Sequence, residues 1–150
     1  MIERILYTAE ASAEGGREGH ARTSDGRLDV KLDVPTEMGG TGGPGTNPEQ
    51  LFAAGWSACF MSAIGLAASQ RKVTLPTDRA IDAEVDLGTT DGAYLLRARL
   101  NVSLPGVPRE VAQALVDAAH QICPYSKATR DNIDVTLCVA GAPIEQPEAA

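Results

Sequence analysis

Residues 47–70, NPEQLFAAGWSACFMSAIGLAASQ, decide the fold of this chain. Asn47 is a residue type that caps helix N-termini, Pro48 suits the first helical position, and Gln50 stands where a capping box would place it. The residues from 51 to 69 carry no charge. A helix over this stretch would therefore be apolar on all sides, which is typical of the buried centre of a globular domain.

The same stretch is almost long enough to span a bilayer. It is dominated by Ala, Gly and Ser, with three serines, rather than by the large apolar residues of most membrane spans. We therefore expect a central helix of a globular domain and no association with a membrane.

Three strands are predicted before the helix. Apolar and charged residues alternate over 28–34, and this period-two pattern predicts a strand. Ser24-Asp25-Gly26 predicts a turn, so residues 19–23 should pair with that strand as a hairpin. Residues 3–12 should add another strand beyond the bend at Gly15-Gly16.

After the helix over residues 47–70, the sequence predicts two further strands, a second helix and a last strand. Alternation over 81–87 and 96–104, joined by a turn at Asp91-Gly92, predicts a second hairpin. An amphipathic helix should run from Pro108 to Cys123, because the following proline ends a helix. Alternation returns over residues 133–139, and the tail over about 142–150 is expected to be loose.

The predicted order is β-β-β-α-β-β-α-β in a single domain over residues 1–150. Grouped strands joined by short turns predict an antiparallel α+β fold rather than a doubly wound parallel sheet.

Composition limits the function classes. The net charge of −7 argues against binding nucleic acid, which requires clustered Lys and Arg. The first ten residues, MIERILYTAE, lack the apolar run of a signal peptide, so we expect a cytoplasmic protein in a reducing compartment. Its three cysteines should then rest as thiols, and a cysteine pair there favours transient redox chemistry or metal binding.

Residues 40–45, GTGGPG, match the glycine pattern of dinucleotide-binding loops. The required βαβ unit and the acidic residue that would hold a ribose are both lacking. We therefore expect a flexible connector and no nucleotide cofactor.

Cys59 and Cys123 are the candidate reactive residues. A cysteine in an apolar helix is commonly a packed small hydrophobe, but the Cys59 sulfur should lie over Gly55, which leaves room for another molecule to approach. Trp56, Phe60 and Ala63 would make such a pocket apolar. Cys123 ends the second helix, and the negative end of a helix suits a resolving thiol better than an attacking one. The third cysteine, Cys138, is expected to be a bystander.

Other readings of these residues stay open. His20 and His120 could join the two cysteines as zinc ligands, although no Cys-x-x-Cys pair is present. The cysteines could also merely pack in a non-enzymatic module. Arg17, in a glycine-flanked segment, could be solvated or could aim its guanidinium into a site. Glu49 is explained equally well as an acidic residue that complements the helix dipole.

Several stretches together resemble the organic hydroperoxide resistance (Ohr) branch of the OsmC/Ohr family, and the likeness covers nearly the whole chain. They read YTA at 7–9, GGREGH at 15–20, TNPEQLFAAG at 46–55, SACF at 57–60, AAHQICPYS at 118–126, ATR at 128–130 and NIDV at 132–135. Three residues depart from the expected pattern: Trp56 replaces Tyr, Lys127 replaces Asn and Asp131 replaces Gly.

The resemblance implies a thiol-dependent peroxidase that reduces organic hydroperoxides to alcohols. It makes Cys59 the peroxidatic thiol and Cys123 the resolving thiol, with Arg17 and Glu49 as the polar pair that activates Cys59. It further implies an intertwined homodimer with a curved antiparallel sheet around the helix, reduction by a dihydrolipoyl group on a lipoylated protein, and no bound metal or flavin. A general OsmC-type peroxidase is the nearest alternative.

Glu49 and Cys59 are ten residues apart, roughly 15 Å along a straight helix. They can serve one site only if the helix breaks near Gly55, if Arg17 bridges the gap, or if a partner subunit supplies Glu49. We favour a site at the dimer interface.

Overall fold

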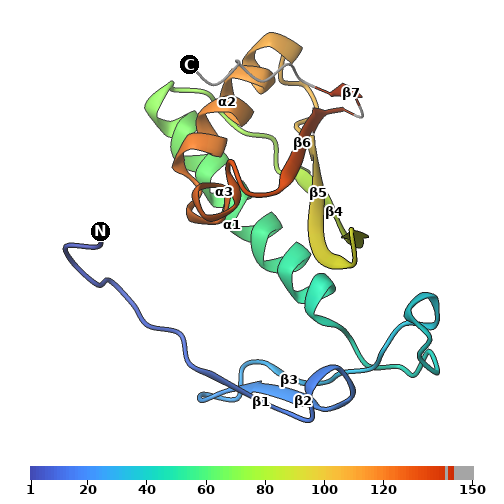
Figure 1. Ribbon diagram of the computed structural model, residues 1–150. Helices are drawn as coiled ribbons and strands as arrows, with labels where there is room; N and C mark the ends of the chain where they lie inside the picture. The colour runs from blue at the N-terminus through green and yellow to red at the C-terminus, as the bar shows by residue number, and fades with distance from the viewer. Residues whose placement is uncertain (141, 144–150) are drawn as a thin grey trace. The chain divides into compact units, whose positions relative to one another are not determined.

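The computed structural model describes residues 1–140 and 142–143. The chain divides into two compact units, Met1–Leu51 and Phe52–Ala150. The helices and strands are labelled in Figure 1.

The first unit contains a three-stranded antiparallel sheet in the order β1-β2-β3. Its strands are β1 (Ala11–Glu14), β2 (His20–Thr23) and β3 (Asp29–Lys31). The strand predicted over 3–12 was therefore placed too early in the chain. The pairing of Glu14 with His20 closes the hairpin around residues 15–19, and this register leaves most of the preceding segment outside the sheet.

The glycine-rich loop, predicted to be a flexible connector, is anchored at its C-terminal end. The loop follows a short 3₁₀ turn, η2 (Thr36–Met38), and returns to the end of β3. The Gly45 N–H donates to the Asp33 carboxylate at 2.5 Å, and the Asp33 N–H donates to the Thr46 carbonyl at 2.9 Å. A Cβ added at Gly43 or Gly45 would lie 2.6–2.9 Å from that carboxylate, which explains why glycine stands there.

Helix α1 (Pro48–Gln70) has the predicted bounds and runs unbroken through Gly55. The Asn47 side chain caps it by accepting the Gln50 N–H at 2.9 Å, as predicted. The second half of the capping box is wrong, because the Gln50 side chain instead accepts a hydrogen bond from the Thr46 hydroxyl at 2.6 Å.

Within the second unit, α1 is the core helix. Trp56, Phe60 and Ile64 have no exposed surface and pack with apolar residues of the sheet and of α2. By length and composition alone α1 could cross a membrane, but core helices pass the same test. Burial of Trp56, Phe60 and Ile64 accounts for the apolar face that α1 turns to this core.

The sheet of the second unit has the order β4-β5-β6-β7. Its strands are β4 (Ala80–Thr90), β5 (Ala93–Ser103), β6 (Asp134–Val139) and β7 (Ala142–Pro143). All neighbouring pairs are antiparallel, as expected, except β5–β6, which is parallel. The chain between β5 and β6 passes through helices, and such a crossover allows two strands to run in the same direction.

Two elements of this unit were not predicted. Helix α2 (Arg109–Ile122) ends as predicted, but Pro124 also opens a second short helix, α3 (Pro124–Thr129). Proline stops one helix and is well suited to the first position of the next. The other addition is β7, which covers two residues of the predicted loose tail; the rest of that tail lies outside the described residues.

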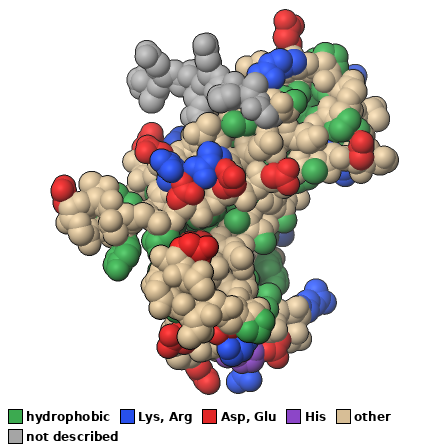
Figure 2. Space-filling view, turned by 90° about the vertical axis from the view of Figure 1, so that its right-hand side faces the viewer, with side chains coloured by type: hydrophobic (Ala, Val, Ile, Leu, Met, Phe, Trp, Pro, Cys, Tyr) green, Lys and Arg blue, Asp and Glu red, His purple; other side chains and the backbone are tan. Residues whose placement is uncertain are grey.

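One face of the β4–β5 hairpin carries a ladder of ion pairs. Arg99 contacts both Asp86 and Glu84, and Arg97 also contacts Asp86. Figure 2 shows acidic and basic side chains intermingled on the side of the molecule where this hairpin lies. These charges neutralise one another across the strands, so the face is polar without a strong net sign.

Replacing Gly45 by alanine tests the role of the anchored loop. The new Cβ would lie 2.8 Å from the Asp33 amide nitrogen and 2.8 Å from the Lys31 carbonyl oxygen, and backbone atoms cannot move aside cheaply. Gly45→Ala should lower the free energy of unfolding by about 1–3 kcal/mol in denaturant titrations. Gly88→Ala is the matched control, because its Cβ would meet nothing within 4 Å. Equal stability of the two variants would contradict a packed loop.

Candidate functional site

Cys59 and Cys123 meet within the second unit. Their sulfur atoms lie 3.3 Å apart and both cysteines are free thiols. A disulfide has an S–S distance of about 2.05 Å, so a short movement would join them. The prediction that these two residues, 64 positions apart, form one site is consistent with this contact.

The turn between α2 and α3 holds Cys123 in place. Cys123 follows the last residue of α2, and its N–H donates to the Ala119 carbonyl at 2.8 Å. Its own carbonyl accepts the Lys127 N–H at 3.0 Å, which begins α3. Because both sides of its peptide backbone are bonded into helices, the fully buried Cys123 thiol has little freedom to move.

Cys59 is half-buried on α1, and its surroundings oppose ionisation. Burial raises the pKa of the Cys59 thiol above its ordinary value, and the neighbouring Cys123 thiol raises it further. The backbone N–H of Tyr125 acts in the opposite direction on the Cys59 pKa, but its effect is smaller. A reactive thiolate at Cys59 therefore requires a positive charge from elsewhere.

The expected opening above Gly55 is filled. A Cβ at Gly55 would lie 3.2 Å from the ring and hydroxyl atoms of Tyr125, so the absent side chain makes room for that ring. Trp56 and Phe60 are fully buried core residues rather than lining of an open pocket. Tyr125 itself remains 41% exposed, and its ring centroid is 6.2 Å from that of Phe52.

Arg17 and Glu49 meet within the first unit. Two guanidinium nitrogens of Arg17 donate to the two carboxylate oxygens of Glu49, at 2.9 and 2.6 Å. This bidentate geometry is the strongest form of arginine–carboxylate pairing. The hydrogen bond from Arg17 holds the pKa of Glu49 below its usual range. Glu49 therefore has a specific partner in addition to its place in the first turn of α1.

The glycines around Arg17 are required by the backbone. Arg17 lies in a 3₁₀ turn, η1 (Gly16–Glu18), and both Gly15 and Gly16 have positive φ, at 73° and 60°. At Gly19 a Cβ would collide with the Glu14 carbonyl oxygen. The glycine-flanked segment thus builds a tight loop that presents one arginine, as the sequence pattern indicated.

The four predicted site residues form two pairs, one in each unit. The structure brings Cys59 to Cys123 and Arg17 to Glu49. Among the described residues no group of three or more His, Cys, Asp or Glu side chains could hold a metal ion, so the zinc-site alternative has no support there. His120 is buried, and burial lowers its pKa, so it carries no charge at neutral pH.

Sequence reasoning missed Tyr125 and Ser126 as parts of the cysteine site. Ser126 has no exposed surface and accepts a hydrogen bond from the Trp56 indole at 3.3 Å. Both residues lie in the motif CPYS at 123–126. Because α3 was not predicted, the sequence did not indicate that their side chains would face α1.

Two departures from the family pattern have a structural explanation. Trp56 supplies the indole N–H that reaches Ser126. Asp131 has a φ of 60°, in the left-handed region that glycine tolerates best, so glycine is the expected residue at that position. Nothing in the structure explains Lys127.

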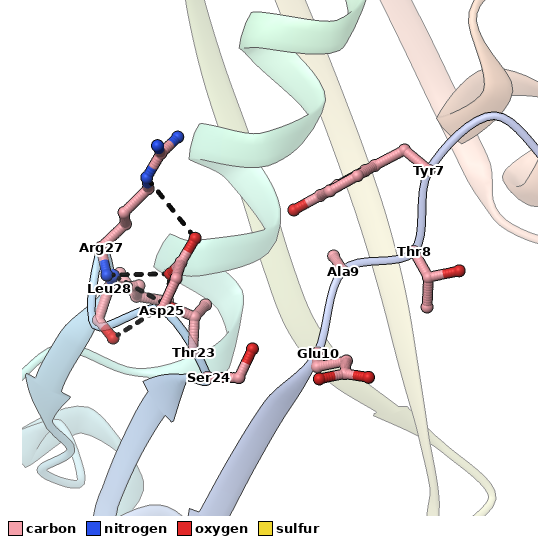
Figure 3. Close-up of a pocket in the computed structure, with 9 residues that line it drawn as sticks. All are labelled: Tyr7, Thr8, Ala9, Glu10, Thr23, Ser24, Asp25, Arg27 and Leu28. Carbon is pink, nitrogen blue, oxygen red and sulfur yellow. Dashed lines mark hydrogen bonds and ion pairs between the residues drawn. The ribbon is translucent and has the colours of Figure 1, made fainter.

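A hollow of 370 Å³ lies in the first unit between the N-terminal segment and the β2–β3 turn (Figure 3). On the turn side the Asp25 carboxylate already accepts hydrogen bonds from the Thr23 hydroxyl and the Arg27 N–H. None of the four predicted site residues lines the hollow. The hollow therefore belongs neither to the cysteine site nor to the Arg17–Glu49 pair.

The Arg17–Glu49 pair should make stability depend on pH. The pKa of Glu49 is lower in the folded protein than its ordinary value of 4.5, so the pair stabilises the fold above that pH and is lost as the pH falls below it. Wild type should exceed Glu49→Gln by up to about 1 kcal/mol at pH 7, and this difference should shrink as the pH is lowered from about 5 to about 2, by chemical denaturation. Glu10→Gln is the control. A difference that stays constant over this pH range would rule out the ion pair as its cause.

Comparison with known proteins gives one consistent result. Residues 40–137 match the family of OsmC-like proteins. The chain is 54% identical over 138 residues to the organic hydroperoxide resistance protein of Xanthomonas axonopodis pv. citri, covering 92% of this chain and 97% of the relative. The crystal structure of an organic hydroperoxide resistance protein OsmC from Legionella pneumophila matches with a TM-score of 0.85 at 47% identity, over 91% of this chain and 98% of that chain.

The organic hydroperoxide resistance protein OhrB of Bacillus subtilis matches in structure with a TM-score of 0.82 at 43% identity, over 90% of this chain and 99% of that chain. The predicted α+β architecture with a long core helix is thus the fold of these proteins. The chain therefore belongs to the OsmC family, and within that family it is similar to the organic hydroperoxide resistance proteins.

Proposed function

We propose that this protein is a cysteine-based peroxidase that reduces organic hydroperoxides to alcohols and so detoxifies them during oxidative stress. The observation that carries the proposal is the 3.3 Å approach of Cys59 to Cys123. A pair of free thiols at this distance, one half-buried and one fully buried, suits a cycle in which the first is oxidised and the second resolves it. Organic hydroperoxide resistance, the property for which the relatives are named, supports the choice of oxidant.

The first step is attack of the Cys59 thiolate on the O–O bond of the hydroperoxide. The O–O bond breaks, Cys59 becomes a sulfenic acid, and the departing alkoxide takes a proton to leave as the alcohol. Burial raises the pKa of Cys59, so the thiolate must be stabilised for this step to proceed at neutral pH.

Arg17 is proposed to supply that stabilisation. Its guanidinium would pair with the thiolate and with the oxygen that departs as alkoxide. The bidentate bond to Glu49 fixes the plane of the guanidinium, so the charge that the thiolate needs is held in one orientation. An Arg–Glu pair supports this role better than a lone arginine, since an unheld side chain loses more rotamer entropy on binding.

The second step joins the two sulfurs. The Cys123 thiol attacks the sulfenic acid of Cys59, the S–S bond forms, and water leaves. A dithiol then reopens the bond by two exchanges, so that both cysteines are reduced and the dithiol becomes a disulfide. We propose a dihydrolipoyl group on a lipoylated protein as this reductant, with no bound metal or flavin.

The proposed assembly is a homodimer in the cytoplasm, with each site at the subunit interface. Helix α1 does not break at Gly55, which removes the first of the three ways to bring Glu49 and Cys59 into one site. We propose that the partner subunit supplies the Arg17–Glu49 pair. Exposed apolar residues near the N-terminus, Ile2, Ile5, Leu6 and Tyr7, support burial of that segment in an assembly.

Serine variants of the cysteines test the cycle. Cys59→Ser should abolish turnover of cumene hydroperoxide with dihydrolipoamide, because it removes the nucleophile. Cys123→Ser should consume about one equivalent and then stop as Cys59 overoxidises. Cys138→Ser, on β6, is the control and should keep wild-type turnover. Steady turnover by Cys59→Ser, or no Cys59–Cys123 bond by mass spectrometry after one equivalent of peroxide, would refute the mechanism.

Removing the charge at Arg17 tests thiolate stabilisation. In a Cys123→Ser/Cys138→Ser background, Arg17→Gln should move the pH midpoint of Cys59 alkylation upward and slow alkylation at pH 7 by about tenfold or more. Arg27→Gln, at an exposed arginine paired with Asp25, is the control. An unchanged alkylation profile in Arg17→Gln would show that another group ionises Cys59.

A further inference from the structure

One hydrogen bond links the helix that carries Cys59 to the helix that follows Cys123. The indole nitrogen of Trp56 on α1 donates to the hydroxyl of Ser126 on α3 at 3.3 Å. Neither side chain has any exposed surface. A buried indole N–H or hydroxyl without a partner is costly, so this contact constrains both helices.

The Trp56–Ser126 hydrogen bond lies three residues in sequence from each of the two cysteines. Trp56 precedes Cys59 by three residues on α1, and Ser126 follows Cys123 by three residues at the start of α3. Residues three apart on a helix are neighbours on its surface. The hydrogen bond therefore joins α1 to α3 one turn away from the point where the two sulfurs lie 3.3 Å apart.

Neighbouring contacts hold the Trp56 indole and the end of α3 in place. The Phe52 ring meets the indole of Trp56 edge-on, with ring centroids 5.5 Å apart, which sets the plane of the indole. On the other side, the Arg130 guanidinium donates to the His120 carbonyl and ties the end of α3 back to the last turn of α2. The turn that carries Cys123 is thus held at its far end by Arg130 and on its α1 side by Trp56.

We propose that the Trp56–Ser126 hydrogen bond is a positioning contact that sets the rate at which Cys123 resolves oxidised Cys59. This inference rests on the proposed function and assigns Trp56 and Ser126 a role in its second step. Disulfide formation demands a short S–S distance and a dihedral angle near 90°, so it is sensitive to where α3 lies. Attack on the peroxide forms no bond to Cys123, and α3 affects this step only through the Tyr125 N–H, whose effect on the Cys59 pKa is smaller than that of burial.

The contact also determines the fate of the sulfenic acid. Resolution by Cys123 competes with a second peroxide, which would convert the sulfenic acid at Cys59 to sulfinic acid. A misplacement of 1 Å can slow a bonding step by up to about a hundredfold. Loss of the Trp56–Ser126 hydrogen bond should therefore lead oxidised Cys59 to overoxidation instead of to the disulfide.

Single-turnover kinetics of Trp56→Phe and Ser126→Ala separate the two steps. With cumene hydroperoxide, oxidation of Cys59 should stay within about twofold of wild type, while formation of the Cys59–Cys123 bond slows by about tenfold or more. Trp56→Phe keeps an aromatic ring and removes the donor, and Ser126→Ala removes only the acceptor. The double variant should be no slower than the slower single variant, since both remove the same bond.

The proposal fails if the Cys59–Cys123 disulfide forms at the wild-type rate in both single variants, or if Cys59 oxidation slows as much as disulfide formation does. It also fails if the rate losses of the two single variants add in the double variant. A second measurement does not require peroxidase activity. The equilibrium between the Cys59–Cys123 disulfide and a glutathione redox buffer should shift about tenfold or more toward the dithiol in each single variant. If the wild-type protein forms this disulfide but consumes no peroxide, the proposed function alone is refuted. If the disulfide equilibrium of the single variants equals that of wild type, the positioning role alone is refuted.

Discussion

The approach of the Cys59 sulfur to the Cys123 sulfur is the contact on which the rest of the site depends. It requires a core helix that places one thiol at the surface of the second unit's core, and a tight α2–α3 turn that places the other against it. The turn exists because Pro124 cannot continue α2 yet is well suited to open α3. Backbone hydrogen bonds on both sides of Cys123 then fix the second thiol with little help from its own side chain.

Burial that brings two thiols together also makes the first one hard to ionise. The pKa of Cys59 is raised by burial and by its neighbour, and the Tyr125 N–H offsets only part of this. The Arg17–Glu49 pair has the opposite character, with a fixed positive group and a carboxylate whose pKa is lowered. The chain thus builds an apolar place for two sulfurs and a separate charged group, and the proposed chemistry needs both.

Local patterns predicted the elements well, and contacts distant in sequence were harder to predict. The bounds of α1 followed from Asn47, Pro48 and a long uncharged run, because caps and apolar runs act within a few residues. The parallel β5–β6 pair, the packing of Tyr125 over Gly55 and the anchoring of Gly45 by Asp33 depend on how remote segments meet. For the site, motif likeness predicted four residues, and the structure brings them together as two pairs. The Trp56–Ser126 contact depends on α3, which the pattern around Pro124 did not reveal.

The absence of a polar stripe on α1 has a consequence for synthesis of the protein. Residues 48–70 leave the ribosome before β5, α2 and β6, whose side chains cover Trp56, Phe60 and Ile64 in the folded core. At ordinary translation rates this uncovered interval lasts several seconds. Residues 51–69, which carry no charge, have no core to pack against until those later segments have been made.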